Sequence, residues 1–216
     1  MECKNIKGLI FDLDGVLLST DHYHYLAWKK LADRLEIPFS EQDNEKLRGV
    51  SRMESLEIVL SNKPELQFTQ EEKVALATEK NDCYREYLKQ LTPDDVTDEV
   101  RSTLKELRAR GYALGVGSSS KNAKFILEKT VMTTYFDAIA DGNDIENSKP
   151  DPEVFEKAAA FLGLEAKCCA VIEDAEAGLE AAIRAGMLPI GYAGARDSKL
   201  KSIGLAQFSD LLENFL

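Results

Sequence analysis

The sequence predicts an α/β fold, in which a doubly wound parallel sheet carries an all-helical segment inserted after its first strand. From Val100 onward, short apolar runs alternate with helical patterns, which is typical of βαβ units. Between roughly Asp21 and Leu91, by contrast, the pattern is helical and contains no convincing strand. The early apolar run Gly8–Phe11 must then belong to the later sheet, because a single strand cannot stand alone beside a helical unit.

The inserted segment is expected to form four helices. Apolar residues share one face of the first helix, which ends before Pro38. Ser51 is placed to cap the third helix, and Thr69 with Glu72 forms a capping box for the long fourth one. The four helices are expected at about 21–36, 40–48, 51–60 and 69–88.

The rest of the chain is expected to form the sheet and its covering helices. Strands are expected at 8–11, 113–117, 136–140, 169–172 and 188–191, with helices at 100–110, from 122, from 152, and at 175–185. This pattern predicts a Rossmann-like core domain made of residues 1–19 and 93–216, with a helical cap domain of residues 20–92 inserted into it. The two chain crossings, near 18–20 and 92–95, are natural hinges.

Composition limits the classes of function. The chain has 216 residues, 44% of them hydrophobic, and a formal net charge of −11. So acidic a chain is not expected to bind nucleic acid, which needs a basic face. No apolar run is long enough to span a bilayer, and the first residues lack a signal-peptide pattern, so we expect a cytoplasmic protein. We also expect it to be a monomer. The cysteines, which show no zinc-binding spacing, are expected to be reduced: Cys3, Cys83, Cys168 and Cys169.

Asp12 and Asp14 follow the first expected strand, and Gly15 lets the chain turn tightly behind them. Ligands of parallel sheets bind beyond the carboxyl ends of the strands, which is where these two acids fall. Together they could serve as nucleophile, metal ligand and proton carrier. Solvated aspartates in an Asx-type turn explain the same residues equally well when these are considered alone.

Polar residues also follow three later strands. Ser118–Asn122 offers hydroxyls and amides at the start of a helix, which suits a phosphate, although a serine-rich N-cap is the commoner explanation. Lys149 precedes a proline-initiated helix and could equally be an exposed loop lysine. Glu173 and Asp174 are a second pair of acids that ends a strand. Two acidic strand ends in one sheet favour a hard-cation site, with Mg²⁺ the usual ion.

Taken in order, these motifs resemble those of the haloacid dehalogenase-like superfamily, and the inserted helices resemble its type-1 cap. The chain is most similar to the β-phosphoglucomutase family within that superfamily. The resemblance covers essentially the whole chain, and each motif would be weak alone. The similar segments are Phe11–Val16, His24-x-x-x-Trp28, Gly49–Arg52, Lys80–Asp82, Ser120–Asn122, Tyr135–Asp141 and Leu188–Gly191.

The resemblance implies roles for the residues of the core domain. Asp12 would attack phosphorus and form an aspartyl-phosphate, while Asp14 would act as general acid and base. Lys149 and Ser118 would hold the transferring phosphoryl oxygens. Mg²⁺ would be held by Asp12, the backbone of Asp14, and Asp174, with Glu173 in or next to the coordination sphere. Together Mg²⁺ and Lys149 are expected to keep the Asp12 carboxylate ionised.

The resemblance also implies a substrate-binding set in the cap and the core. Arg52 would grip the non-reacting phosphate of a bisphosphate, because its planar fork suits phosphate. The implied substrate is a small phosphorylated sugar, with β-glucose 1,6-bisphosphate as intermediate and activator. The alternative for Arg52 is a solvated residue in the first turn of a helix, and for His24 a structural histidine. The implied binding residues are Asp14, His24, Trp28, Gly49, Val50, Arg52, Lys80, Ser120, Lys121 and Asn122.

The resemblance supports an isomerase that converts β-D-glucose 1-phosphate to glucose 6-phosphate. A sugar-phosphate phosphatase of the same fold needs the same core and only a leakier cap. A binding module without catalysis would not need the nucleophile Asp12. The sequence departs from the family near the first hinge, where Leu18 and Ser19 replace Thr and Asp, and at Arg48, which replaces Lys. Hinge chemistry governs how well the cap excludes water.

Overall fold

A computed structural model describes residues 6–47 and 50–215 of the chain. The chain divides into two compact units. The core unit comprises Met1–Ser19 and Thr92–Leu216, and the helical unit comprises Thr20–Leu91.

The core unit contains a parallel sheet of six strands in the order β3-β2-β1-β4-β5-β6. The central strand β1 pairs with β2 on one side and with β4 on the other, and its four residues are fully buried. This is the strand order of a Rossmann-like fold, in which the winding direction reverses between β1 and β4. The strands are β1 (Gly8–Phe11), β2 (Ala113–Gly117), β3 (Ala138–Ala140), β4 (Cys169–Glu173), β5 (Leu188–Gly191) and β6 (Ile203–Gly204).

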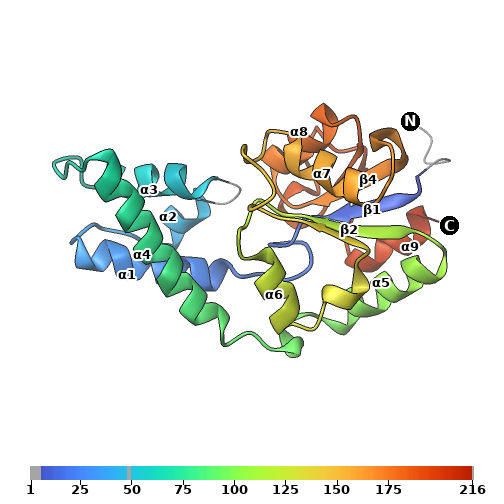
Figure 1. Ribbon diagram of the computed structural model, residues 1–216, viewed down its shortest axis with the longest axis horizontal. Coiled ribbons are helices and arrows are strands. Elements are labelled where there is room, and N and C mark those ends of the chain that lie inside the picture. Colours follow the sequence, from blue (N-terminus) through green and yellow to red (C-terminus); the bar gives the residue numbers. More distant parts are fainter. Residues whose placement is uncertain (1–5, 48–49, 216) are drawn as a thin grey trace. The chain divides into compact units, whose positions relative to one another are not determined.

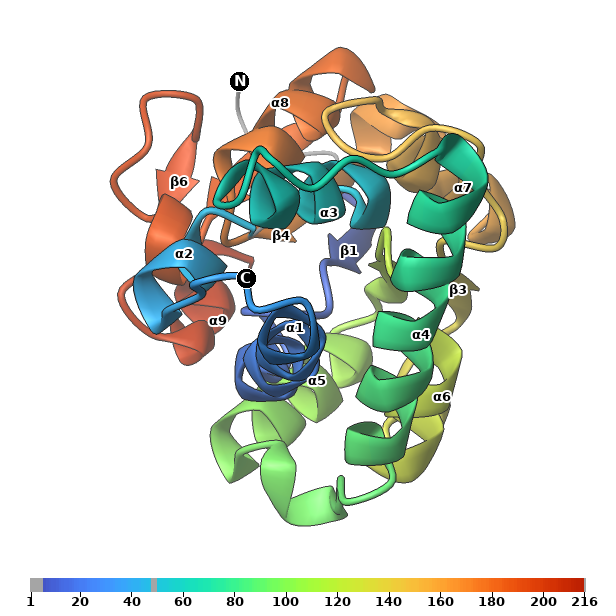
Figure 2. The same cartoon turned by 90° about the vertical axis from the view of Figure 1, so that its left-hand side faces the viewer.

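Helices cover both faces of this sheet. In Figures 1 and 2, α7 and α8 lie over one face, and α5, α6 and α9 lie over the other. Buried residues of α7 and α8, such as Phe155 and Ala181, pack against β1 and β4 in one hydrophobic cluster. The helices are α5 (Asp98–Ala109), α6 (Ala123–Lys129), α7 (Glu153–Phe161), α8 (Glu176–Arg184) and α9 (Leu211–Asn214).

The helical unit contains α1 (Asp21–Arg34), α2 (Glu41–Glu45), α3 (Arg52–Ser61) and α4 (Gln70–Leu88), which pack on a hydrophobic cluster of their own. Side chains define the helix starts as the sequence predicts. Ser51 and Thr69 accept hydrogen bonds from the backbone N–H groups of Glu54 and Glu72, which complete capping boxes for α3 and α4. Trp28 is only 2% exposed and lies in this cluster.

The predicted fold class is confirmed, with a six-stranded parallel sheet between two helical layers. The two-residue strand β6 and the short helix α9 are among the elements that the sequence pattern did not reveal. Both are too short to show a period of two or of 3.6 residues. Among the described residues, no helix has the length and apolar character needed to cross a membrane.

Candidate active site

Asp12 and Glu173 lie where the topology predicts a ligand site. Asp12 directly follows β1, and its N–H donates to the carbonyl of Ile172 at 3.0 Å, which continues the pairing of β1 with β4. Glu173 is the last residue of β4. The two acids therefore flank the point at which the winding of the sheet reverses, at the carboxyl ends of the strands. Asp12 is 8% exposed and Glu173 only 1%.

Lys149 ties these two strand ends together. Its Nζ forms an ion pair with Asp12 Oδ1 and another with Glu173 Oε1 at 2.6 Å, and it donates to the carbonyl of Gly117 at 3.1 Å. The Lys149 side chain is 7% exposed, so it is a buried site residue and not an exposed loop lysine. Gly117 ends β2, and the lysine thus links three neighbouring strands of the sheet.

The electrostatics of this cluster are dominated by an excess of acid. Burial, together with the nearby charges of Glu173 and Asp174, raises the pKa of the Asp12 carboxyl well above its usual range, although Lys149 opposes this. Burial lowers the pKa of Lys149, but the charges of Asp12 and Glu173 outweigh it and raise that pKa overall. Lys149 therefore opposes the effect of burial on Asp12 without reversing it, and the expectation that Mg²⁺ and Lys149 together keep Asp12 ionised stays a prediction.

Two glycines make room for the acidic side chains. Gly15 has a φ of +83°, and a Cβ added there would lie 2.1 Å from Asp174 Oδ2. A Cβ on Gly178, in the first turn of α8, would lie 1.9 Å from Glu173 Oε1. Any larger residue at either position would displace an acid of the site. Gly178 is a position that periodicity did not single out, and only the three-dimensional contact reveals its importance.

The acidic residues fit a hard divalent cation. Asp12, Glu173 and Asp174 each offer a carboxylate oxygen, and these atoms all lie within 4.8 Å of one another. Oxygen ligands and a net negative charge are what Mg²⁺ prefers. Glu173 is already engaged, because Oε1 pairs with Lys149 and Oε2 accepts from the N–H groups of Asp174 and Ala175 at 2.9 and 3.0 Å. Its carboxylate therefore suits orientation of the site better than direct coordination.

The loop after β2 satisfies much of its own polarity. Ser118 is buried, and its Oγ accepts a hydrogen bond from the N–H of Ser120 at 3.2 Å. Ser120 Oγ in turn accepts from the N–H of Asn122 at 3.2 Å. Asn122 is buried, whereas Lys121 is exposed. Because Gly117 contacts Lys149, the loop begins beside the acidic cluster, with Ser118 as its first residue.

In the helical unit, the predicted residues His24, Trp28 and Lys80 form a second cluster. Lys80 is buried, with its Nζ 2.8 Å from His24 Nδ1 and 4.7 Å from the centre of the Trp28 ring. Tyr84 supports it, because its ring stacks on His24 with centroids 4.0 Å apart and lies 4.8 Å from Lys80 Nζ. The Tyr84 hydroxyl forms a 2.7 Å hydrogen bond with Thr20 Oγ1. Trp28 is thus a core residue that contacts the lysine.

Arg52 is the first residue of α3 and is half-buried, which differs from a fully solvated residue of a first turn. Its Nη2 donates a hydrogen bond of 2.8 Å to Asn81 Oδ1 on α4. Burial lowers the pKa of Arg52, while the charge of Asp82 raises it. Val50 is half-buried in the preceding loop, and Gly49 lies outside the described residues. Asn81 was not among the predicted site residues.

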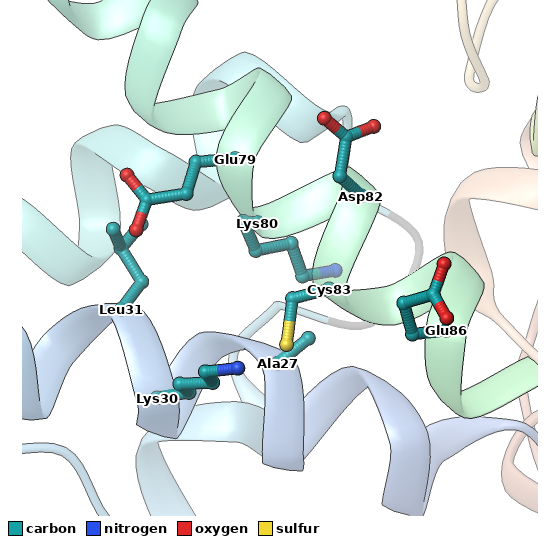
Figure 3. A pocket seen from close by; sticks show the side chains of 8 residues that line it. All are labelled: Ala27, Lys30, Leu31, Glu79, Lys80, Asp82, Cys83 and Glu86. Carbon is teal, nitrogen blue, oxygen red and sulfur yellow. The ribbon is translucent and has the colours of Figure 1, made fainter.

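A pocket of about 300 Å³ opens between α1 and α4 of the helical unit (Figure 3). Among the predicted site residues that the structure describes, Lys80 alone lines it. Its walls carry charges of both signs, so its chemistry favours neither an anion nor a cation. The lining residues are Ala27, Lys30, Leu31, Glu79, Lys80, Asp82, Cys83 and Glu86.

Comparison with known proteins agrees with this geometry. The chain matches the model of the haloacid dehalogenase-like hydrolase family over residues 6–186. It is 40% identical over 207 residues to the β-phosphoglucomutase of Bacillus subtilis (strain 168), which covers 95% of this chain and 92% of the relative. It is 32% identical over 181 residues to the fructose-1-phosphate phosphatase of Escherichia coli (strain K12), which covers 83% of this chain and 93% of the relative.

A solved structure gives the same result. The crystal structure of the β-phosphoglucomutase from Clostridium difficile superposes with a TM-score of 0.88 at 35% sequence identity, over 97% of both chains. Both the sequence and the fold are therefore similar to those of sugar-phosphate enzymes. The chain belongs to the haloacid dehalogenase-like hydrolase family and, within it, to the β-phosphoglucomutase family of enzymes.

Proposed function

We propose that the protein is an isomerase that interconverts β-D-glucose 1-phosphate and glucose 6-phosphate through β-glucose 1,6-bisphosphate. The observation that carries this proposal is the buried pairing of Asp12 with Lys149 at the carboxyl edge of the sheet. A carboxylate nucleophile beside a buried ammonium group suits phosphoryl transfer, in which negative charge is spread over the equatorial oxygens. The bisphosphate serves as both intermediate and activator.

In the proposed reaction, phosphorylated Asp12 gives its phosphoryl group to the 6-hydroxyl of β-glucose 1-phosphate, and Asp14 takes the proton from that hydroxyl. The resulting bisphosphate turns over in the site. Asp12 then attacks the phosphorus of the phosphate group on carbon 1. The bond from this phosphorus to the sugar oxygen breaks, and Asp14 returns its proton to that oxygen. The products are glucose 6-phosphate and the aspartyl-phosphate form of the enzyme.

The remaining core residues hold charge in place. Lys149 and the Ser118 hydroxyl would bind the oxygens of the transferring group. Asp12, the backbone carbonyl of Asp14, and Asp174 would hold Mg²⁺, and Glu173 would orient Lys149 and the start of α8. When bound, Mg²⁺ supplies positive charge that stabilises negative charge on the phosphoryl oxygens and offsets the acid excess of the cluster.

We propose that the helical unit acts as a cap. Residues 20–92 would form the cap domain, and residues 1–19 and 93–216 would form the catalytic core domain. Arg52 would bind the phosphate that does not react, together with Ser120, Lys121 and Asn122 from the core unit. His24 and Lys80 would couple binding to the position of Asp14, with Trp28, Gly49 and Val50 shaping the sugar site. We further propose that the enzyme acts as a cytoplasmic monomer without nucleic-acid or membrane partners.

The second candidate is a sugar-phosphate phosphatase. The 32% identity to a fructose-1-phosphate phosphatase favours it. A phosphatase would use the same core chemistry, with water in place of the sugar hydroxyl as the acceptor of the phosphoryl group. A mutase must in addition retain a phosphate that does not react, and a cationic residue in the cap meets that need. Arg52 is such a residue, so the mutase is preferred.

Phosphorus NMR separates the two candidates. The protein is mixed with Mg²⁺, β-glucose 1-phosphate and a trace of β-glucose 1,6-bisphosphate, and the products are followed over time. A mutase converts the substrate to glucose 6-phosphate, and this conversion requires the bisphosphate. Release of inorganic phosphate as the main product would contradict the proposal and establish a phosphatase.

A further inference from the structure

The proposed reaction assigns no role to Asn81, which lies between Lys80 and Asp82 on α4. Its side chain is half-buried, and Oδ1 accepts the 2.8 Å hydrogen bond from Arg52 Nη2. The two residues come from different helices and are 29 positions apart in the chain. Arg52, as the first residue of α3, has no preceding helical turn on which its long side chain could lie. The hydrogen bond to Asn81 therefore directs its guanidinium group toward α4.

The chemistry of the acceptor matters as much as the contact. A carboxamide oxygen is a neutral acceptor, so it orients the guanidinium group without cancelling its positive charge. A carboxylate in the same place would form an ion pair and compete with an incoming phosphate for the same donors. The chain has the neutral residue at the contact and the acid, Asp82, at the neighbouring exposed position, from which its charge raises the pKa of Arg52.

Resting on the proposed mutase function, we propose that Asn81 is a positioning residue. Its carboxamide holds the Arg52 guanidinium in the orientation that binds the non-reacting phosphate of β-glucose 1,6-bisphosphate, and it leaves the charge of Arg52 available to that phosphate. The competing explanation is purely structural, in which the hydrogen bond only fastens α3 to α4.

Replacement by aspartate separates these explanations. Asn81→Asp keeps an acceptor of nearly the same shape and adds a charge, so it preserves or strengthens a tie between the helices. The same change neutralises Arg52 and must weaken phosphate binding. Asn81→Ala removes the acceptor altogether. Thr78→Ala, at an exposed position one turn earlier on α4, is the matched control.

Binding is measured in the Asp12→Asn background, where the nucleophile is absent and the ligand is not consumed. The dissociation constant of β-glucose 1,6-bisphosphate is determined by calorimetry in the presence of Mg²⁺, and thermal unfolding is recorded for each variant. Both Asn81→Ala and Asn81→Asp should raise the dissociation constant by roughly tenfold, the loss expected for a charge-assisted contact. Thr78→Ala should leave it unchanged. Asn81→Asp should unfold at the parent's temperature or above.

A second comparison tests whether Asn81 acts through Arg52. Once Arg52→Ala is present, adding Asn81→Ala should cause no further loss of binding. The proposal is overturned if Asn81→Asp binds as the parent does, if the two losses add, or if the parent binds no bisphosphate. Isomerisation by the unmodified enzyme is assayed separately, so failure of the mutase proposal is distinguished from failure of this one.

Discussion

The charged clusters of the core unit and the helical unit are built in opposite ways. In the core unit, three carboxylates lie close to one another, and two of them, those of Asp12 and Glu173, form ion pairs with the buried Lys149. In the helical unit, Lys80 lies against a neutral imidazole and two aromatic rings, and Arg52 donates to a neutral carboxamide. The core cluster carries more acid than base, whereas in the helical unit the hydrogen bond of Arg52 goes to a neutral group and the acid Asp82 acts on it only from the neighbouring exposed position.

This difference indicates what each cluster is suited to bind. An excess of buried carboxylate is costly unless a cation offsets it, so the core cluster suits a divalent ion and, through it, a phosphoryl group. The Arg52 guanidinium, whose hydrogen bond goes to a neutral carboxamide, keeps its charge and suits an anion. The proposed bisphosphate would use both clusters, whereas a single phosphate would need only the first.

The largest effect is expected at the nucleophile. Asp12→Asn removes the carboxylate that would form the covalent intermediate, so turnover should fall by roughly 10⁴-fold or more. Isomerisation in a coupled assay measures this loss, and circular dichroism checks that the fold is retained. Retention of a tenth of the activity would remove Asp12 from the role of nucleophile.

Removal of the metal should cost nearly as much. Exhaustive chelation should abolish isomerisation, and added Mg²⁺ should restore it, because the acid excess around Asp12 is then offset again. Asp174→Ala should raise the Mg²⁺ concentration that gives half-maximal activity by about tenfold or more. A chelated enzyme with full activity would mean that Lys149 alone provides the positive charge of the core cluster.

Arg52→Ala should have an intermediate effect, because it tests the helical unit alone. Loss of a charge-assisted, bidentate phosphate contact is worth on the order of 2–3 kcal/mol, hence roughly a hundredfold in isomerisation. Asp12 should still be phosphorylated by acetyl phosphate, as judged by mass spectrometry. The phosphorylated variant should hydrolyse in water at least as fast as the phosphorylated unmodified enzyme.

Two results of the Arg52→Ala experiment would contradict the comparison. Unchanged isomerisation would mean that the second phosphate is not held by Arg52, and the phosphatase candidate would gain. Loss of phosphorylation by acetyl phosphate as well would place Arg52 in the core chemistry or in the fold, so the two clusters would not divide the work as proposed.

The sequence predicted the strand ends of the core cluster because topology alone brings them together. Carboxyl ends of parallel strands meet at one edge of a sheet, so acids that follow β1 and β4 must be neighbours. Periodicity could not predict the burial of Lys149, since a loop has no period and an isolated loop lysine is usually exposed. The same holds for Gly178, whose role depends on where the Glu173 side chain lies.

The helical unit was harder to predict at the level of single residues. Its helices followed from capping boxes and apolar faces, but the pattern of α4 does not show which polar residue meets a neighbouring helix. Asn81 was therefore missed. Trp28 lies on the same face as Leu31 and Ala32, and the structure places all three in the core of the helical unit, while its role at the sugar site stays a prediction.

The smallest effect concerns His24 and tests the charge state of the helical cluster. Burial first, and then the charges of Lys80 and Arg52, lower the pKa of His24 well below its ordinary value of 6.5. At low pH the unfolded chain therefore binds a proton at His24 that the folded chain does not bind. The stabilisation is complete above about pH 6.5 and falls as the pH drops toward the lowered pKa.

His24→Asn should flatten this dependence and raise the unfolding temperature at pH 5, relative to that at pH 7, by only a few degrees. The same change at the exposed His22 controls for the loss of an imidazole from α1. Equal pH dependence in the His24→Asn variant and the unmodified protein would mean that His24 is not held neutral by the cations beside it.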